Sequence, residues 1–169
     1  IRTLNLDEVN KLGEGVKAIA LPDERWDKVD IKTTNLIPNI LAQTKAEKKF
    51  AYTAMLFRDG ICTEGATSNV FAVKDGILYT HPADNHILKG ITRQMIVTRV
   101  APSLGITLIE KEFDRAFVDD ADELFFTDTI GGVIPIIKLD KNPVSGGKPG
   151  HVTLRLREAL EKLMEEGLP

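Results

Sequence analysis

Residues 69–80 read NVFAVKDGILYT, which is two β-rich runs on either side of the pair Asp75-Gly76. Aspartate and glycine tolerate the positive φ angles of a two-residue turn, so this pattern is a strong signal for a β-hairpin. The segment TEGATS (63–68) lies just before the hairpin, and the segment HILKGITR (86–93) lies just after it. The hairpin therefore separates an acidic turn from the glycine-led start of a helix.

The glycine-led segment predicts an anion site. Gly90-Ile91-Thr92 opens an apolar-periodic helix, whose first N–H groups have no partner within the helix and lie at the positive end of its dipole. Such a terminus can receive a phosphate, although a plain helix cap would explain Thr92 equally well. Together with the carboxylate of Glu64, one hairpin away, this terminus suggests a site for a phosphorylated cofactor.

The composition is that of one globular domain. The chain has 169 residues, of which 43% are hydrophobic and 28% charged, so it can bury a sizeable core. Its formal net charge is −3 and its basic residues are scattered among acids, which gives no indication of a nucleic-acid or membrane partner. The single cysteine, Cys62, cannot form an intrachain disulfide, and this agrees with a cytoplasmic location.

Strands and helices are expected to intermix without strict βαβ alternation, which favours a mixed α/β or α+β domain. We expect Asn35 to cap a helix that runs to about Lys49, with Pro38 in its first turn. A second helix should start near Thr92 and be kinked or shortened by Pro102. The other expected elements are strands at 16–20, 51–57, 61–63, 106–109, 124–127 and 133–139, a turn capped by Asp114, a loop at 145–150 and an amphipathic helix over 152–163.

Six motifs follow one another along the chain: RW (25–26), DIK (30–32), TEG (63–65), SNV (68–70), DGILYTHP (75–82) and LKGITR (88–93). They resemble the motifs of the class IV (fold type IV) pyridoxal-phosphate aminotransferases and look most like those of the D-amino acid (D-alanine) branch. The resemblance runs from about Gly15 to Pro169, with the motifs in family order.

The resemblance implies a particular fold and domain organisation. Residues 15–169 would form the C-terminal, cofactor-binding domain of a fold type IV enzyme, in which a mixed sheet forms a pseudo-barrel with flanking helices. Residues 1–14 would be a linker remnant. The family carries a smaller N-terminal domain ahead of this part, and because the chain starts with Ile1 rather than Met we expect that domain to be absent here.

Lys32 follows the run Val29-Asp30-Ile31, where flanking apolar groups can partly desolvate it and make its amine a better nucleophile for an aldehyde. As one of 22 lysines and arginines, it can equally be an ordinary surface residue. The resemblance implies that Lys32 is the catalytic lysine. It would hold pyridoxal 5'-phosphate as a Schiff base and later move the proton between the substrate Cα and the cofactor C4′.

Glu64 and Arg25 are the other charged candidates. The resemblance puts Glu64 beside the pyridine nitrogen, where an anionic carboxylate keeps that nitrogen protonated. A glutamate that caps a turn is the alternative. The resemblance puts Arg25 near the phenolic oxygen of the cofactor, and the alternative is an arginine that pairs with Asp23 or Asp27.

The remaining candidates form a phosphate cup and a ring contact. The resemblance implies that Gly90, Ile91, Thr92 and Thr129 hold the cofactor phosphate through backbone N–H groups and hydroxyls. It also implies that Leu88 packs against one face of the cofactor ring, whereas the residue alone would simply be core.

Two features of the sequence qualify the resemblance. The turn TIGGV (129–133) replaces a more polar turn of many D-alanine enzymes, which leaves (R)-amines or a broader range of D-amino acids open as substrates. In the family, a phosphate-gripping arginine and the groups that trap the substrate carboxylate come from the N-terminal domain.

The histidines show no metal-ligand spacing and are interpreted as structural, so no metal site is expected; they are His81, His86 and His151.

The resemblance implies transamination between a D-amino acid and a 2-oxo acid, in a protein that is usually a homodimer. Two other enzymes of this kind are alternatives. One is the branched-chain L-amino acid aminotransferase, and the other is 4-amino-4-deoxychorismate lyase, which shares the lysine, the glutamate and the phosphate cup but eliminates pyruvate. A reading of another class is that the chain is a catalytically incompetent domain, since it would lack half of the substrate pocket.

Overall fold

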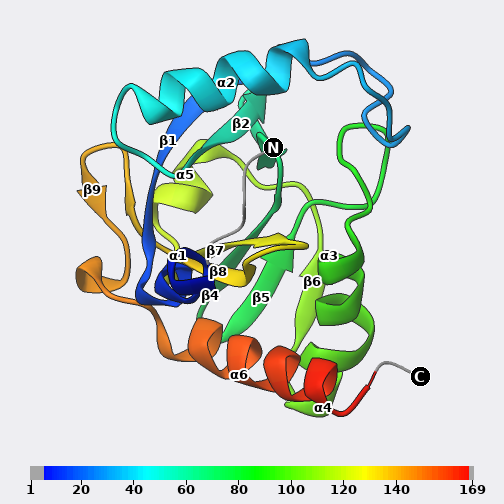
Figure 1. Ribbon diagram of the computed structural model, residues 1–169, viewed down its shortest axis with the longest axis vertical. Coiled ribbons are helices and arrows are strands. Elements are labelled where there is room, and N and C mark those ends of the chain that lie inside the picture. Colours follow the sequence, from blue (N-terminus) through cyan, green and yellow to red (C-terminus); the bar gives the residue numbers. More distant parts are fainter. Residues whose placement is uncertain (1–5, 168–169) are drawn as a thin grey trace.

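The computed structural model describes residues 6–167 and consists of one curled mixed sheet flanked by helices (Figure 1). The strand order is β3-β2-β1-β8-β7-β4-β5-β6, with β9 paired to β8. The sheet curls into an open half-barrel, so the expected mixed sheet with a pseudo-barrel shape is confirmed. The strands are β1 (Val16–Pro22), β2 (Thr53–Arg58), β3 (Ile61–Gly65), β4 (Asn69–Lys74), β5 (Ile77–Thr80), β6 (Leu108–Glu110), β7 (Glu123–Asp128), β8 (Gly132–Leu139) and β9 (Asn142–Pro143).

The helices lie on both sides of the sheet. Within the described part of the chain, no helix is long and apolar enough to cross a membrane. The helical elements are α1 (Leu6–Lys11), α2 (Ile37–Glu47), α3 (Ile91–Met95), a π-helical segment (Ile96–Val100), α4 (Ala101–Ser103), α5 (Arg115–Asp119), α6 (His151–Glu165), and 3₁₀ turns at Leu12–Glu14 and Ser145–Gly147.

The hairpin predicted from residues 69–80 is confirmed. β4 and β5 pair antiparallel up to Lys74 and Ile77, and Asp75 and Gly76 at the turn have φ angles of 51° and 73°. These positive angles are those of the hairpin turn that Asp-Gly favours. The Asp75 N–H also donates to Asp122 Oδ2 at 2.7 Å, which ties the turn to the chain just before β7.

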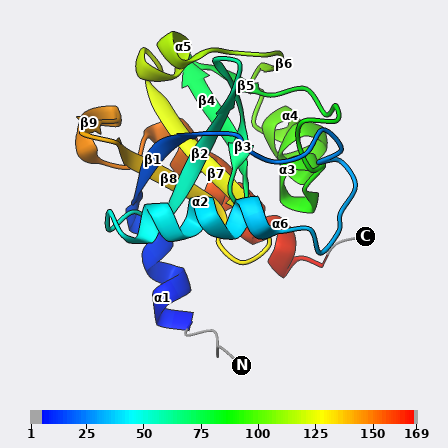
Figure 2. The ribbon, with the colours of Figure 1, turned by 90° about the horizontal axis from the view of Figure 1, so that it is seen from above.

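Parallel pairing requires crossovers, and helices supply them. β1 and β2 are parallel neighbours joined through α2, and β5 and β6 are parallel neighbours joined through α3, the π-helical segment and α4. Each crossover lays a helix against the sheet, because a parallel connection has to return to the same end. Figure 2 shows α2 lying across the β1–β2 side of the sheet.

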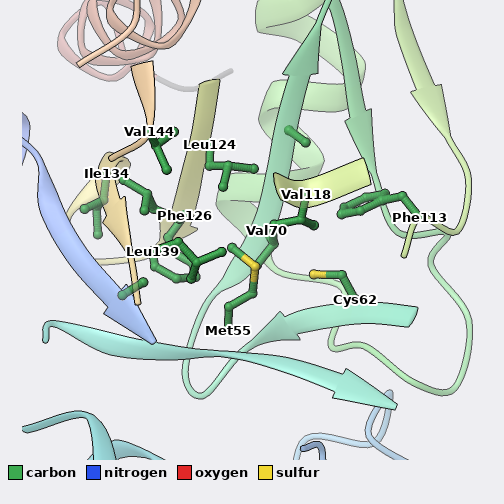
Figure 3. Packing of buried hydrophobic residues seen from close by; sticks show 13 residues of the cluster. Met55, Cys62, Val70, Phe113, Val118, Leu124, Phe126, Ile134, Leu139 and Val144 are labelled. Carbon is green, nitrogen blue, oxygen red and sulfur yellow. The ribbon is translucent and has the colours of Figure 1, made fainter. Parts of the chain in front are cut away.

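Strands β4 and β7 are buried on both faces of the sheet. Along β4, Val70 and Ala72 belong to the core inside the curl, whereas Phe71 and Val73 belong to the core beneath α6 and the α3–α4 crossover. Figure 3 shows the inner core, where Met55 lies against Val70. Burial on both faces explains why these strands read as nearly continuous apolar runs.

Two details of the helices differ from the sequence-based expectations. Helix α2 begins at Ile37 with Leu36 at its N-cap and no side-chain cap, so the predicted cap at Asn35 is wrong, although Pro38 does lie in the first turn. The crossover helix passes Pro102 and ends at Ser103, and the π-helical segment just ahead of the proline is a distortion that the expected kink or shortening did not specify. The π-helical segment accommodates the proline, because the Ala101 N–H bonds to the Ile96 carbonyl five residues back and shifts the hydrogen-bond register ahead of the ring.

Candidate active site

A cavity of about 360 Å³ opens at one end of the sheet. Five segments line it: the irregular chain after β1, the first turn of α2, the β3–β4 turn, the loop that leads into α3, and the β7–β8 turn. Every candidate residue selected from the sequence lines this one cavity, namely Arg25, Lys32, Glu64, Leu88, Gly90, Ile91, Thr92 and Thr129.

Strand register brings these segments together. Asn69, the first residue of β4, pairs with Thr127 near the end of β7, so the turn before β4 and the turn after β7 lie side by side. The chain after β1 meets the loop after β5 where the Val29 N–H donates to the Asn85 carbonyl at 2.9 Å. Figure 1 shows these two loops next to each other, beyond the N-terminal start of α2.

Glu64 lies at the inner end of the cavity and is only 4% exposed. One carboxylate oxygen accepts from Arg25 Nη1, and the other accepts from Asn69 Nδ2 at 2.8 Å and from the Leu88 N–H at 3.0 Å. Burial raises the pKa of Glu64 to about 7, against the opposing effect of Arg25 and the Leu88 hydrogen bond. The cavity therefore presents a carboxyl group that ionises near neutral pH.

Arg25 is held by two acids. Its guanidinium binds Asp23 through Nε at 2.8 Å and Nη2 at 2.7 Å, in addition to its contact with Glu64. Burial would lower the pKa of Arg25, but Asp23 and Glu64 outweigh it and raise the pKa. Arg25 thus forms the pair with Asp23 that was the alternative interpretation of its sequence context, whereas Asp27 pairs with Arg58.

Asp23 completes the charged cluster, and the sequence offered it only as a possible partner of Arg25, not as a residue of the site. Burial alone would raise its pKa, yet the hydrogen bond and the charge of Arg25 hold the pKa of Asp23 below its usual range. The Thr63 hydroxyl donates to its Oδ2 at 2.9 Å. An acidic residue two positions before a candidate arginine is a weak signal, because such spacing is common on protein surfaces.

Asn69 is a second residue that was not selected from the sequence. Its Nδ2 donates both to Glu64 and to the Leu88 carbonyl, each at 2.8 Å, so it joins the β3 strand to the loop before α3. A Cβ on Gly90 would lie 2.3 Å from Asn69 Oδ1, which only a glycine at position 90 avoids. A polar residue at the head of a fully buried strand is the signal that points to Asn69.

The predicted phosphate cup lies where α3 begins. Gly90 is the N-cap of α3 and has no capping side chain, so the first N–H groups face the cavity end without one. Thr92 Oγ1 donates to the Asp128 carbonyl at 2.8 Å, which joins α3 to the β7–β8 turn. Thr129 is exposed on that turn.

The β7–β8 turn is fixed by Asp128, which was not selected from the sequence either. Its Oδ1 accepts from the Ile130 N–H at 2.8 Å and from the Gly131 N–H at 2.6 Å, and its Oδ2 accepts from the Tyr52 hydroxyl at 3.1 Å. Burial and the charge of Asp128 raise the pKa of Tyr52, so this phenol stays a donor. The turn that carries Thr129 is therefore held in place by hydrogen bonds to the Asp128 side chain.

Lys32 lies at the mouth of the cavity, in the irregular segment between β1 and α2. The expected partial desolvation is wrong for this structure. Lys32 is exposed, and its neighbour Ile31 is 51% exposed, because this segment forms no strand that would bury alternate side chains. Lys32 reaches the cavity from the solvent side.

The residues present fit pyridoxal phosphate. A carboxylate accepts about four hydrogen bonds, and Glu64 uses three, which leaves one for a protonated ring nitrogen. Two buried hydroxyls in the cavity wall, Ser68 Oγ and Thr127 Oγ1, have no hydrogen-bond partner and can serve a polar ligand. The uncapped start of α3 suits a phosphate dianion. The cavity volume is within the usual range for small-molecule sites.

Known proteins resemble this chain over most of its length. The model of the amino-transferase class IV family matches residues 4–139. D-alanine aminotransferase of Staphylococcus aureus (strain COL) is 42% identical over 154 residues, which are 91% of this chain and 54% of the relative. D-alanine aminotransferase of Bacillus licheniformis is 40% identical over 147 residues, which are 87% and 52%. The chain spans about half the length of the curated relatives it matches.

Solved structures of aminotransferases also resemble this chain over most of its length. A branched-chain aminotransferase from Thermoproteus uzoniensis, crystallised with norvaline, superposes with a TM-score of 0.83 at 31% identity, over 89% of this chain and 52% of the other. A T.th. branched-chain amino acid aminotransferase complexed with N-(5'-phosphopyridoxyl)-L-glutamate has a TM-score of 0.83 at 29% identity, over 94% and 54%.

Proposed function

The chain belongs to the class IV aminotransferases, and from that premise we propose that it is the cofactor-binding half of an enzyme that transfers the amino group of a D-amino acid to a 2-oxo acid. The proposal rests on one observation above all: Lys32, Glu64 and the start of α3 line the same cavity. The cofactor is pyridoxal 5'-phosphate, in agreement with the phosphopyridoxyl compound in the T.th. structure.

The D-amino acid is favoured over a branched-chain L-amino acid by sequence. D-alanine aminotransferases are 40–42% identical to this chain, whereas the branched-chain enzymes of known structure named above are 29–31% identical. The structural likeness to the branched-chain enzymes keeps L-leucine-type substrates as the second candidate. A substrate range broader than D-alanine rests on the sequence of the turn 129–133 alone, because Gly131 and Gly132 do not line the cavity and a Cβ on Gly131 would meet Ile134 at 2.5 Å.

When bound, the cofactor supplies an aldehyde that condenses with amines and a ring that accepts the electron pair of the substrate Cα–H bond. Lys32 supplies the amine that holds the cofactor covalently between turnovers. When it is not bound to the cofactor, the same amine would be the base that takes the proton from the substrate Cα and the acid that delivers it to the cofactor carbon C4′. The exposed position of Lys32 leaves its side chain free to move between these two tasks.

The other residues of the site position the cofactor and hold its ring nitrogen in the protonated form. Glu64 keeps a proton on the ring nitrogen, and Arg25 and Asn69 hold its carboxylate in place for that purpose. The N–H groups of Ile91 and Thr92, the hydroxyl of Thr129 and the open approach at Gly90 bind the phosphate.

Leu88 completes the assignment of the site, and Cys62 bears on the location of the protein. Leu88, whose N–H and carbonyl are both bound within the Glu64–Asn69 network, packs against one ring face. Cys62 is a buried free thiol, in keeping with the cytoplasmic location that we propose.

We assign residues 15–169 to the cofactor-binding domain and residues 1–14 to the connection with an N-terminal domain. The relatives are about twice as long as the chain, which supports a second domain in the whole protein. That domain would supply the groups that grip the substrate carboxylate. Alone, the 169-residue chain should bind the cofactor weakly and turn over very slowly, because catalysis needs preorganised groups from both domains.

The whole protein is further proposed to be a homodimer. On α2, the outward face carries Ile37, Ile40 and Leu41, which are 68%, 60% and 52% exposed, and Leu36 extends this patch towards the cavity. An exposed apolar patch of this kind on a charged, globular chain marks an interaction surface.

The test uses the full-length protein with pyridoxal phosphate. Incubation with D-alanine and 2-oxoglutarate should release pyruvate, and omission of 2-oxoglutarate should stop it after one turnover. Faster amino transfer from L-leucine would indicate the branched-chain enzyme, and multiple turnovers of pyruvate from 4-amino-4-deoxychorismate without an acceptor would indicate the lyase.

A second readout locates the lysine. After borohydride reduction, peptide mapping should find a pyridoxyl group on Lys32 in the unaltered protein and none in Lys32→Ala. Lys28→Ala is the matched control, since Lys28 is exposed on the same loop but outside the cavity. A label that persists in Lys32→Ala would overturn the assignment.

A further inference from the structure

Two of the three histidines of the chain come together with an aspartate on the loop between β5 and α3. His81, Asp84 and His86 each offer one ligand atom, and these three atoms lie within 4.8 Å of one another. From the sequence, the histidines were interpreted as structural and no metal site was expected. In the structure the loop folds back on itself and brings the side chains of the spacing H-x-x-D-x-H into a cluster that could hold an ion.

The distances are close to those of a coordination sphere. Asp84 Oδ1 is 3.9 Å from His81 Nδ1, and Asp84 Oδ2 is 3.7 Å from His86 Nδ1. Ligand atoms of a tetrahedral zinc ion are about 3.4 Å apart, as metal–ligand bonds of about 2.0–2.1 Å require. These two contacts, which involve different oxygens of Asp84, would each have to shorten by about half an ångström, and the widest pair of ligand atoms, which lies within 4.8 Å, by up to about 1.4 Å. The two rings are nearly perpendicular, with centroids 6.3 Å apart, so they do not stack in a way that blocks the space between them.

The loop is held in this shape without an ion. Asp84 Oδ1 accepts the His86 N–H at 2.8 Å, which forms a tight turn inside the cluster. The buried Arg93 donates to the His81 carbonyl at 2.8 Å, and the Val29 N–H donates to the Asn85 carbonyl. Binding would not have to order the chain first, and this lowers the entropic cost of coordination.

Access comes from the solvent side. The side chain of His81 is 1% exposed, whereas those of Asp84 and His86 are 35% and 34% exposed. An ion can enter between Asp84 and His86 and meet His81 at the inner end. Water would then complete the coordination, as in zinc sites with three protein ligands.

We propose that His81, Asp84 and His86 bind a divalent transition-metal ion, for which zinc is the best match. Imidazole nitrogens with one carboxylate suit zinc and its neighbours in the first transition row, whereas magnesium and calcium prefer sites made of oxygen. If His81 ligates through Nδ1, its proton lies on Nε2, and the present 3.0 Å contact of Nδ1 with the Pro82 carbonyl is given up.

The site would clamp the loop that borders the candidate active site. The His86 carbonyl accepts from Arg25 Nη2 at 3.2 Å, and two residues later the Leu88 N–H donates to Glu64. An ion between His81 and His86 would restrain both of these contacts. The proposal does not depend on the proposed aminotransferase activity, since it uses other side chains and can be tested without cofactor.

The experiment measures zinc binding by the full chain, freed of metal and without cofactor, against a chromophoric zinc chelator. The unaltered chain should bind one equivalent of ZnCl₂. His86→Ala and Asp84→Asn should each lower the affinity by about tenfold or more. The matched controls, His151→Ala and Cys62→Ala, remove the other histidine and the only thiol and should leave the affinity unchanged.

A second measurement guards against altered folding of the variants. CoCl₂ should give the visible absorption of four-coordinate cobalt with the unaltered chain and with His151→Ala, but not with Asp84→Asn, whose amide oxygen can still accept the His86 N–H. Zinc binding that is lost in His151→Ala, retained in His86→Ala, or absent from the unaltered chain would overturn the proposal.

Discussion

Asn69 and Gly90 approach each other more closely than any side chain at position 90 would allow, since a Cβ there would lie 2.3 Å from Asn69 Oδ1. Asn69 uses this position to donate to Glu64 and to the Leu88 carbonyl. The head of β4, the buried acid and the start of α3 are thus joined at one point. Two of the segments that line the cavity, the β3–β4 turn and the loop into α3, depend on this approach.

Gly90→Ala should therefore disturb the cavity. The added methyl group would displace Asn69 from Glu64 and cost about 1–3 kcal/mol in the free energy of unfolding. The affinity for pyridoxal phosphate, measured by absorbance titration, should fall about tenfold or more. Gly13→Ala is the control, because its Cβ also meets a polar side chain, the Arg157 guanidinium at 3.0 Å, but neither residue lines the cavity. Equal effects of the two substitutions would contradict the role of Asn69.

The raised pKa of Glu64 predicts a pH-dependent stability of the cofactor-free protein. A glutamate has a pKa of 4.5 when unfolded, and Glu64 has a pKa of about 7 when folded. Between these values the unfolded chain releases the proton that the folded chain keeps, so the free energy of unfolding falls as the pH rises from 4.5 to 7. The loss is about 3 kcal/mol and is complete above about pH 7.

The measurement compares urea unfolding of the unaltered protein and Glu64→Gln from about pH 5 to about pH 8. Glutamine cannot ionise, so the difference in stability between the two proteins should shift in favour of Glu64→Gln by most of that amount. Asp23 does not contribute in this range, since Arg25 holds its pKa below the usual value. A flat difference would mean that Arg25 fully compensates the buried charge.

Local patterns predicted much of the fold. The Asp75-Gly76 turn and the apolar runs of β4, β7 and β8 appear where expected, because strand burial and turn chemistry are encoded by neighbouring residues. The start of α2 and the π-helical segment before Pro102 were not predicted. Both depend on how the helix fits the sheet, which has no counterpart in residue periodicity.

The candidate site, like the fold, could be predicted only in part from the sequence. Motifs selected eight residues that do line one cavity, whereas the partners that hold them had to be seen in three dimensions. Arg25 and Glu64 are 39 positions apart, and their contact follows from the way the chain after β1 folds over the end of β3. The cluster of His81, Asp84 and His86 was missed for a related reason, because a loop without periodicity gives no rule for which side chains converge.

The core beneath α6 contains a parallel stack of Phe71 and Phe125, with ring centroids 4.9 Å apart and an interplanar angle of 3°. Phe125→Ala should lower the free energy of unfolding by about 3–5 kcal/mol, because neither ring is exposed. A double-mutant cycle with leucine at both positions should give a coupling of about 0.5–1.5 kcal/mol. Phe50→Leu, at a residue that is 90% exposed, should change stability by less than about 0.5 kcal/mol, and an equal loss there would contradict this ranking.

The apolar face of α2 predicts the effect of a charge on assembly. Ile40→Glu in the full-length protein should shift the proposed homodimer towards monomer, as measured by light scattering after size-exclusion chromatography, because a carboxylate would be buried without a partner. Leu154→Glu is the control, since Leu154 is 43% exposed on α6, a different helix. A dimer that is weakened equally by both substitutions, or by neither, would remove α2 from the interface.

Asp128 predicts how far the β7–β8 turn depends on a single side chain. Asp128→Ala removes the acceptor of the Ile130 N–H, the Gly131 N–H and the Tyr52 hydroxyl, and should cost about 2–3 kcal/mol in the free energy of unfolding. Asp128→Asn keeps an acceptor oxygen and should cost about 1 kcal/mol. Because the Thr92 hydroxyl donates to the backbone carbonyl of residue 128, the loosened turn should also weaken the binding of inorganic phosphate to the cofactor-free protein. Calorimetry with the two variants checks both effects, and a turn that is equally stable with alanine would show that the β7–β8 pairing alone holds it.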